Sequence, residues 1–109
     1  MKKMQINNPN GSIAYWKSDV FILSRDTLFF LHGLTADHTM FEQQFLFFEN
    51  DYNIIAWDAP AQGESRPYVS FTYGEAANAI KTILTECGIS QVILIGQSMG
   101  GYISQAFIR

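Results

Sequence analysis

Charged side chains are scarce in this sequence. Asp, Glu, Lys and Arg make up 16% of its 109 residues, against about 25% in a typical soluble domain. Seven basic residues face ten acidic ones, which gives a formal net charge of −3, and the only run of cations is Lys2–Lys3. Because phosphate backbones are bound by clustered cations, this composition argues against a nucleic-acid partner.

Cysteine and histidine are also rare. A single Cys87 excludes an internal disulfide and a cysteine-rich zinc site, and its place on an apolar helix stripe predicts a core residue. The two histidines and the scattered carboxylates show no paired ligand spacing, so we expect no metal. Neither a G-x-G-x-x-G pattern nor a Gly-Lys-Ser/Thr loop is present, and we expect no cofactor.

Long apolar runs are missing as well. The longest, such as Leu28–Leu31 and Val92–Ile95, fall far below the roughly 20 residues that cross a bilayer. The first eleven residues are rich in Asn and Gln, and they contain no apolar core of a signal peptide. We therefore expect no membrane segment and a cytoplasmic protein.

Apolar and aromatic residues, in contrast, are abundant. Hydrophobic residues make up 48% of the chain and aromatic residues 15%, with nine Phe, five Tyr and two Trp. A chain of this length buries only roughly two thirds of the surface that it exposes when unfolded. This apolar content is large for so small an interior. We therefore expect either that the core is shared with another chain or that the sequence is a piece of a longer protein.

Hydrophobic periodicity predicts an alternation of strands and helices. The expected strands are Ile13–Lys17, Val20–Leu23, Thr27–Leu31, Asn53–Trp57 and Gln91–Ile95, and the expected helices are Asp37–Phe48, Tyr73–Cys87 and Met99–Arg109. The first two strands are expected to form a hairpin that turns near Ser18–Asp19, and Asp58–Pro67 is expected to be a loop. Strand–helix alternation predicts the α/β class, with a mainly parallel sheet and right-handed crossovers.

Two of the helices carry end signals. Thr72 and Glu75 have capping-box spacing before the second helix, and Gly88 follows it where a left-handed residue is favoured. Thr39 and Glu42 have the same capping-box spacing in the first helix. These signals predict defined starts for both helices and a defined end for the second.

The segment Gly96–Gly100 reads Gly-Gln-Ser-Met-Gly between an expected strand and an expected helix. A strand-to-helix turn this sharp forces Ser98 into a strained backbone conformation and crowds its neighbours, which explains glycine at Gly96 and Gly100. The turn lifts the Ser98 hydroxyl at the carboxyl end of the strand, where open α/β sheets bind ligands. The free N–H groups and the dipole at the start of the helix suit an oxyanion.

Two further segments complete a resemblance to the α/β-hydrolase family. His32–Thr35 follows the expected strand Thr27–Leu31, where these enzymes carry a His-Gly segment. Asp58–Ser65 is similar to the family's D-x-x-G-x-G-x-S loop, although Ala61 stands where the pattern has its first glycine. Gly96–Gly101 then resembles the nucleophile elbow, in the same chain order. The resemblance covers the chain from about residue 28 onward.

The resemblance implies roles for individual residues. Ser98 would be the nucleophile, and the N–H groups of Leu34 and Met99 would form the oxyanion hole. His32 and His38 are expected not to act as the catalytic base: His32 precedes the serine in chain order and would shape the oxyanion loop, and His38 is expected at a helix start, exposed to solvent. The remaining motif residues would support the loops: His32, Gly33, Asp58, Gly63, Gly96 and Gly100. Asp58 in particular is expected to form structural hydrogen bonds rather than to be the triad acid.

The family's catalytic acid and histidine follow the serine along the chain. None of the residues after Ser98 is Asp, Glu or His, and a serine without a base is a poor nucleophile. We therefore expect residues 1–109 to be the N-terminal portion of one α/β-hydrolase domain, inactive alone. Its exposed sheet edge at Gln91–Ile95 would favour a homodimer or other association.

Three functions stay open. The resemblance favours a serine hydrolase of a small ester, thioester or related acyl substrate. Serine rather than aspartate at the elbow argues against dehalogenases and epoxide hydrolases. An acyltransferase, a C–C hydrolase, a lyase or a cofactor-free peroxidase on the same fold would carry the same elbow. A truncated, non-catalytic interaction module is the third reading, and the missing base supports it.

Overall fold

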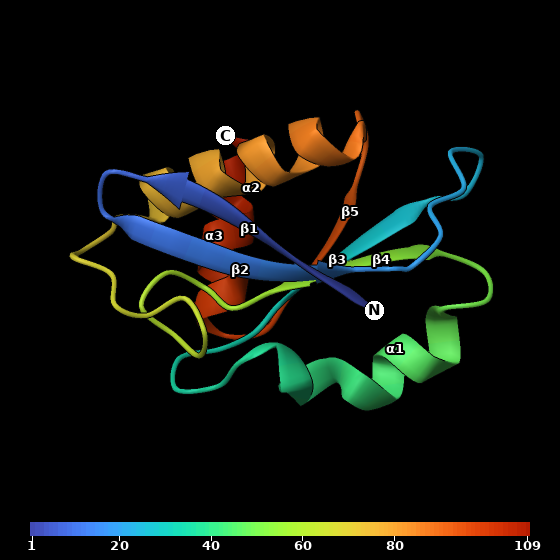
Figure 1. The fold of residues 1–109 in the computed structure, drawn as a ribbon, viewed down its shortest axis with the longest axis horizontal. Coiled ribbons are helices and arrows are strands. Elements are labelled where there is room, and N and C mark those ends of the chain that lie inside the picture. Colours follow the sequence, from blue (N-terminus) through green and yellow to red (C-terminus); the bar gives the residue numbers. More distant parts are fainter.

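A computed structural model describes all residues from Met1 to Arg109. Its centre is a five-stranded sheet in the order β1-β2-β4-β3-β5 (Figure 1). The strands are β1 (Lys2–Asn8), β2 (Gly11–Lys17), β3 (Thr27–Leu31), β4 (Asn53–Trp57) and β5 (Ile93–Gly96). The central strands β4, β3 and β5 run parallel, and β1 and β2 add an antiparallel hairpin at one edge. The prediction of an α/β fold with a mainly parallel sheet is confirmed.

Helices cover both faces of the sheet. The 3₁₀-helix η1 (His38–Phe41) and α1 (Glu42–Phe48) lie on one face, and α2 (Tyr73–Cys87) and α3 (Met99–Ile108) lie on the other (Figure 1). Alternate residues of β3 pack into two hydrophobic clusters, one on each face of the sheet. Phe29 and Leu31 belong to the cluster under α2 and α3, whereas Leu28 and Phe30 pack toward η1 and α1. This alternation explains why β3 reads as an unbroken apolar run.

The predicted hairpin between Ile13–Lys17 and Val20–Leu23 is wrong. One edge of β2 pairs antiparallel with β1, with Ile6 opposite Ile13, and Ile6 is buried. The other edge of β2 pairs with β4, so no place is left beside it for residues 20–23. Val20 and Leu23 accordingly lie exposed. The alternation of Met4 and Ile6 with polar residues was the signal for β1.

The first helical segment also differs from the prediction. Asp37, rather than Thr39, caps it, because the Asp37 carboxylate accepts the Thr39 N–H at 2.9 Å. The first turn, His38–Phe41, is a 3₁₀-helix, and the α-helix begins only at Glu42. The Thr39–Glu42 capping box is therefore not formed: an aspartate two residues earlier is as good a cap and takes its place.

The later elements lie close to their expected positions. Helix α2 has the predicted bounds, its Thr72 hydroxyl accepts the Glu75 N–H, and Gly88 ends it in the left-handed conformation with φ 70°. Strand β5 begins two residues later and ends one residue later than Gln91–Ile95. It is an edge strand with β3 as its one neighbour. None of the helices combines the length and the apolar character needed to cross a membrane.

Candidate active site

Ser98 lies at the junction of β5 and α3, at the carboxyl edge of the parallel strands. Its backbone has φ 56° and ψ −115°, a conformation that L residues rarely adopt. Serine at the first position of a helix usually caps it, but the Ser98 hydroxyl makes no capping hydrogen bond. The side chain is exposed. The strained turn therefore presents a free hydroxyl to solvent instead of using it to stabilise the helix.

The two flanking glycines are required by space. A Cβ atom on Gly96 would lie 2.5 Å from the carbonyl carbon of Gly100, and a Cβ atom on Gly100 would collide with the carbonyl oxygen of Leu31. Real Cβ atoms do not approach backbone so closely. Helix α3 therefore leaves the strand edge at this sharp angle only if both positions lack a side chain.

The loop after β3 packs directly onto the serine. A Cβ atom on Gly33 would lie 3.3 Å from the Ser98 Cβ and would collide with the Gln97 side chain. The Gln97 N–H donates to the Leu31 carbonyl oxygen at 3.0 Å, which continues the pairing of β5 with β3 beyond the sheet. The His-Gly segment and the serine turn, more than sixty residues apart in the sequence, thus form one surface.

His32 orients the first peptide of this loop. The Ala59 N–H donates to His32 Nε2 at 2.9 Å, so Nε2 is unprotonated, and Nδ1 carries the proton that it donates to the Gly33 carbonyl oxygen at 2.8 Å. That carbonyl also accepts the Ala36 N–H at 3.2 Å. In a planar trans peptide the N–H points opposite to the carbonyl, so the Leu34 N–H points away from His32. Both ring nitrogens of this buried histidine are occupied.

Two backbone N–H groups near Ser98 remain available. No protein acceptor takes the Leu34 N–H, and the Leu34 side chain is exposed. In the first turn of α3, Gly100, Gly101 and Tyr102 donate to the carbonyl oxygens of Gln97 and Ser98. The N–H of Met99, whose side chain is buried, has no such acceptor. These are the two N–H groups that the resemblance to α/β hydrolases implies for an oxyanion hole.

Asp58 is fully buried, and it holds two loops together. Its Oδ1 accepts the His38 backbone N–H at 2.7 Å and lies 2.8 Å from His38 Nδ1, and its Oδ2 accepts the Glu64 N–H at 2.8 Å. Gly63, with φ 47°, passes so close that a Cβ atom there would collide with the Asp58 carboxylate. The Ser65 hydroxyl bridges the Asp58 carbonyl and the Ala14 N–H. With every carboxylate oxygen occupied, Asp58 has the hydrogen bonding of a structural residue.

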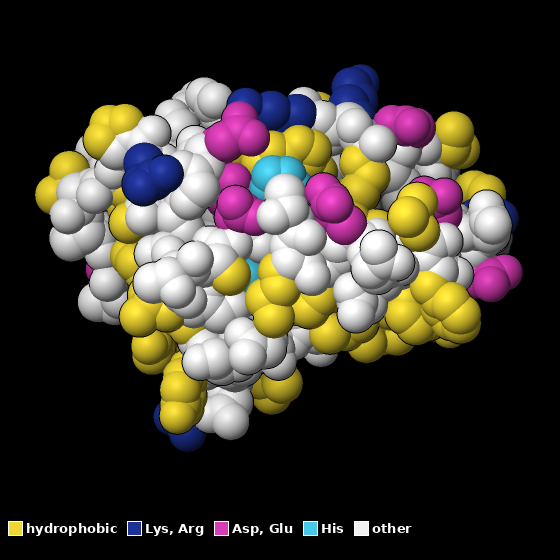
Figure 2. Space-filling model, turned by 90° about the horizontal axis from the view of Figure 1, so that it is seen from below, with side chains coloured by type: hydrophobic (Ala, Val, Ile, Leu, Met, Phe, Trp, Pro, Cys, Tyr) yellow, Lys and Arg dark blue, Asp and Glu magenta, His cyan; other side chains and the backbone are white.

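His38 is less exposed than predicted. It begins η1, as expected, but its imidazole stacks on the Trp16 ring with 3.5 Å between ring centroids, and 20% of the side chain is exposed. The cause is the carboxylate of Asp58, which holds Nδ1 inward. Figure 2 shows a histidine side chain at the surface with acidic side chains on both sides of it.

Asp37, His38 and Asp58 form a group of three that could hold a metal ion, with ligand atoms within 4.8 Å of one another. The protein already supplies donors to these atoms, since His38 Nδ1 faces Asp58 and Asp37 accepts from Thr39. The hydrogen bond from the Thr39 side chain holds the pKa of Asp37 below its ordinary value. The group is thus satisfied without an ion. Sequence spacing did not indicate it, because Asp58 comes from a different loop.

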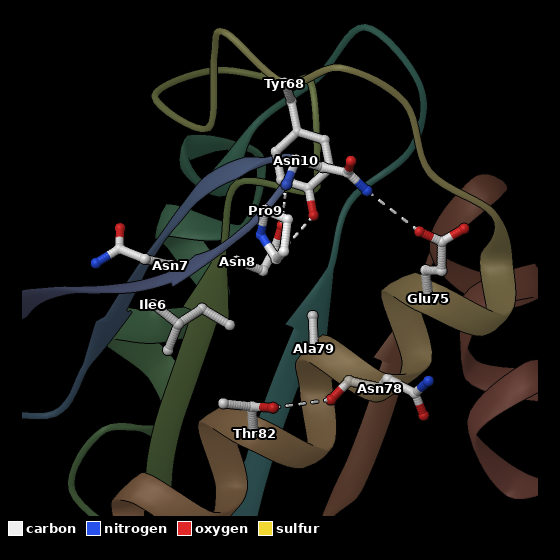
Figure 3. A pocket seen from close by; sticks show the side chains of 10 residues that line it. All are labelled: Ile6, Asn7, Asn8, Pro9, Asn10, Tyr68, Glu75, Asn78, Ala79 and Thr82. Atoms are coloured by element: carbon white, nitrogen blue, oxygen red, sulfur yellow. Dashed lines mark hydrogen bonds between the residues drawn. The ribbon is translucent and has the colours of Figure 1, made fainter.

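A polar cavity of about 260 Å³ lies elsewhere, between the β1–β2 turn and α2 (Figure 3). Its polar side chains pair with one another: the Asn8 amide donates to the Tyr68 hydroxyl at 2.7 Å, and the Asn10 amide donates to Glu75 at 3.4 Å. The Thr82 hydroxyl donates a hydrogen bond to the Asn78 carbonyl oxygen. None of its lining residues belongs to the loops around Ser98, and its contacts tie the hairpin to α2.

Cys87 lies at the end of α2, half-buried against the core under that helix. Burial raises the pKa of its thiol. The thiol is therefore less nucleophilic than a free cysteine at neutral pH, and the side chain is a packing element, as predicted.

The fold and the strained serine turn together define the class of protein: an α/β hydrolase. Residues 26–108 match the family model described as the alpha/beta hydrolase fold, and the chain belongs to this family. It is 35% identical over 82 residues to YugF, an uncharacterized hydrolase of Bacillus subtilis strain 168, and 33% identical over 79 residues to the AB hydrolase superfamily protein YisY of the same strain. These matches cover 73% and 71% of this chain but 30% of each relative.

Solved structures show the same fold. The N-acyl homoserine lactonase AidH, in complex with N-butanoyl homoserine, matches 99% of this chain with a TM-score of 0.85 and 22% identity, over 40% of its own length. Est816, an N-acyl homoserine lactone degrading enzyme, matches 94% with a TM-score of 0.83 and 19% identity, over 39% of its length. The chain thus spans less than half the length of both of these structures.

Proposed function

We propose that this chain supplies the nucleophile and the oxyanion hole of a serine hydrolase that cleaves a small ester, thioester or related acyl compound. The observation that carries the proposal is the Ser98 turn. Its hydroxyl is free and exposed at the carboxyl edge of the sheet, its φ is 56°, and the two flanking positions admit only glycine. Strain of this kind persists where a site needs it.

The reaction would proceed in two steps. Ser98 Oγ loses its proton to a base and attacks the acyl carbonyl carbon, and the negative charge that develops on the carbonyl oxygen is stabilised by the Leu34 and Met99 N–H groups. Each fixed donor of this kind contributes on the order of 3 kcal/mol in similar sites. As the tetrahedral intermediate collapses, the base returns the proton to the leaving oxygen or sulfur, the alcohol or thiol departs, and an acyl-serine remains. Water then attacks the acyl carbon and releases the acid and free Ser98.

The catalytic base must come from outside residues 1–109. His32 cannot serve, because its Nε2 accepts the Ala59 N–H and its Nδ1 is bonded to Gly33. His38 has its Nδ1 bonded to Asp58, which would leave Nε2 free to act, but no hydrogen bond joins this ring to Ser98 and its ring is stacked on Trp16. The family's triad order, with the acid and histidine after the serine, supports the same assignment. We infer that the 109 residues alone turn over substrate poorly.

A fluorophosphonate probe tests this proposal. A longer protein that carries these residues together with the later acid and histidine should be labelled covalently, and Ser98→Ala should abolish the labelling. Hydrolysis of a panel of short-chain esters, thioesters and lactones should disappear with the same substitution. The hydrolase proposal is refuted if a correctly folded protein with an intact triad neither reacts with the probe nor cleaves any ester.

The same serine and elbow also support acyl transfer, C–C hydrolysis, a lyase step or cofactor-free peroxidation. Acyl transfer would show as capture of the acyl group by an added alcohol or amine in place of water. A non-catalytic interaction module would leave Ser98 unlabelled in every longer form of the protein.

A further inference from the structure

The loop that carries Leu34 is a tight turn in a conformation that its sequence does not favour. The Ala36 N–H donates to the Gly33 carbonyl oxygen, which closes a four-residue turn over Gly33–Ala36. Its third residue, Thr35, has φ 64°, whereas Leu34 before it has no positive φ. This is the pattern of a type II turn, which normally has glycine at the third position. A β-branched residue there is a marked outlier, and it persists only if the surroundings hold it.

Gln62 makes the contact that holds it. The Thr35 N–H donates to Gln62 Oε1 at 3.1 Å. This N–H belongs to the central peptide of the turn, between Leu34 and Thr35, and type I and type II turns differ by a flip of that peptide. In the type I form, which threonine prefers, the N–H would point to the opposite face of the turn. The acceptor on Gln62 is therefore satisfied in only one of the two forms.

The backbone around Gln62 is itself fixed in a loop that lies against the turn. The Gln62 N–H donates to the Ala59 carbonyl oxygen at 2.9 Å, and the Gln62 carbonyl accepts the Ser65 N–H at 2.8 Å. Ala61, directly before it, has φ 69° and donates its N–H to the Ser65 carbonyl oxygen. The side chain of Gln62 is half-buried. A short loop, fixed by backbone hydrogen bonds on both sides of Gln62, thus holds the Gln62 amide oxygen in a defined position.

We propose that Gln62 is a positioning residue that selects the type II form of the Gly33–Ala36 turn. By accepting the Thr35 N–H it keeps the central peptide from flipping, and so it maintains the loop geometry in which the Leu34 N–H stays free beside Ser98. The consequence for catalysis rests on the proposed function, in which Leu34 is an oxyanion donor. The selection of the turn form by Gln62 does not rest on the proposed function, because the turn is a property of the folded chain.

The turn is tested directly by NMR on the isotope-labelled 109-residue chain. A type II turn places Leu34 Hα close to the Thr35 amide proton, whereas a type I turn places the amide protons of Leu34 and Thr35 close together. We expect the first pattern in the wild type and a shift toward the second in Gln62→Ala, with amide exchange at Thr35 faster by about tenfold, the loss of one hydrogen bond. Gln44→Ala, an exposed glutamine on α1, should change neither.

Two further variants separate positioning from general damage. Gln62→Glu keeps an acceptor and should retain the type II pattern. In a Thr35→Gly background, Gln62→Ala should have a much smaller effect, because glycine adopts positive φ without support. An unchanged Leu34–Thr35 pattern in Gln62→Ala would overturn the proposal, and so would loss of the pattern in Gln62→Glu while the rest of the spectrum is preserved.

Kinetics on the longer, triad-bearing protein test the catalytic consequence. Gln62→Ala should lower kcat for an activated ester by about tenfold and leave KM within about twofold, since an oxyanion donor acts in the transition state. An unchanged kcat in a protein whose turn has flipped would refute the catalytic part. An inactive wild type would refute the proposed function and leave the NMR result standing.

Discussion

Gly100 packs against Leu31 so closely that a methyl group on Gly100 would overlap the Leu31 carbonyl oxygen. This contact brings the start of α3 onto the end of β3, and it sets the angle at which the helix leaves the sheet. Leu31 also accepts the Gln97 N–H. One backbone carbonyl of β3 thus meets both sides of the serine turn, which explains why the turn has a single geometry.

Gly100→Ala should therefore destabilise the fold by at least about 2 kcal/mol, because backbone on both sides has to move to admit the methyl group. Urea unfolding followed by circular dichroism measures the change. Gly74→Ala is the matched control: its nearest neighbour would be the Thr72 hydroxyl at 3.7 Å, and it lies in α2. It should leave stability unchanged or raise it by up to about 1 kcal/mol. Equal effects of the two substitutions would contradict this account.

Ser98→Gly should raise the free energy of unfolding by about 1 kcal/mol, because glycine adopts the conformation at φ 56° and ψ −115° without strain. Ser98→Ala keeps the strain and should bring no such gain. Denaturant unfolding of the two variants separates strain from loss of the hydroxyl. If Ser98→Ala gains as much as Ser98→Gly, the serine turn is not strained.

Asp37 should make stability depend on pH. The Thr39 hydrogen bond lowers the pKa of Asp37 in the folded chain, so the charged carboxylate stabilises the fold. That contribution is fully present above the unfolded value of about 3.9 and is lost as the pH falls through the lowered folded value. At pH 7, Asp37→Ala should cost about 1 kcal/mol, as for other helix caps.

Asp37→Asn is the control for this titration, because asparagine keeps a capping oxygen but carries no charge. The difference in unfolding free energy between the wild type and Asp37→Asn should shrink as the pH is lowered from 6 toward 2. Unfolding curves at several pH values measure it. A difference that stays constant over that range would show that Asp37 does not contribute through its charge.

The free edge of β5 should promote self-association of the 109-residue chain. β5 has β3 as its one neighbour, and Ile93 on it is 47% exposed. Unpaired N–H and C=O groups beside apolar side chains form a template for another strand. Light scattering after size exclusion should show a mass that rises with concentration. Ile93→Lys should reduce the rise, whereas Val20→Lys, at an exposed position outside β5, should not. A monomer at every concentration would refute the prediction.

Local patterns predicted the elements that local forces determine. β3, β4 and α2 have the predicted bounds, since short apolar runs and helix caps depend on interactions within a few residues. The predicted Val20–Leu23 strand is wrong because strand pairing is not local: β-rich residues form a strand only where a neighbour offers a free edge, and β4 already occupies that edge of β2.

Ala61 shows the limit of motif comparison. It stands where the family pattern has glycine, so the motif alone does not determine the conformation of its loop. The structure shows φ 69°, the conformation that glycine adopts easily. Thr35, Ala61 and Ser98 are the three residues other than glycine with positive φ, and all three lie in the loops of the candidate site. Backbone strain thus marks the site independently of its motifs.

From the sequence alone, one could derive the α/β class, the serine turn and its two glycines, because steric exclusion between close neighbours follows from residue order. The tertiary structure decided the tautomer of His32, the burial of His38 on Trp16, and the bond from Thr35 to Gln62. Each of these depends on side chains and peptides that meet across distant segments. Their hydrogen bonds and strain exist only once β3, β4 and β5 lie side by side.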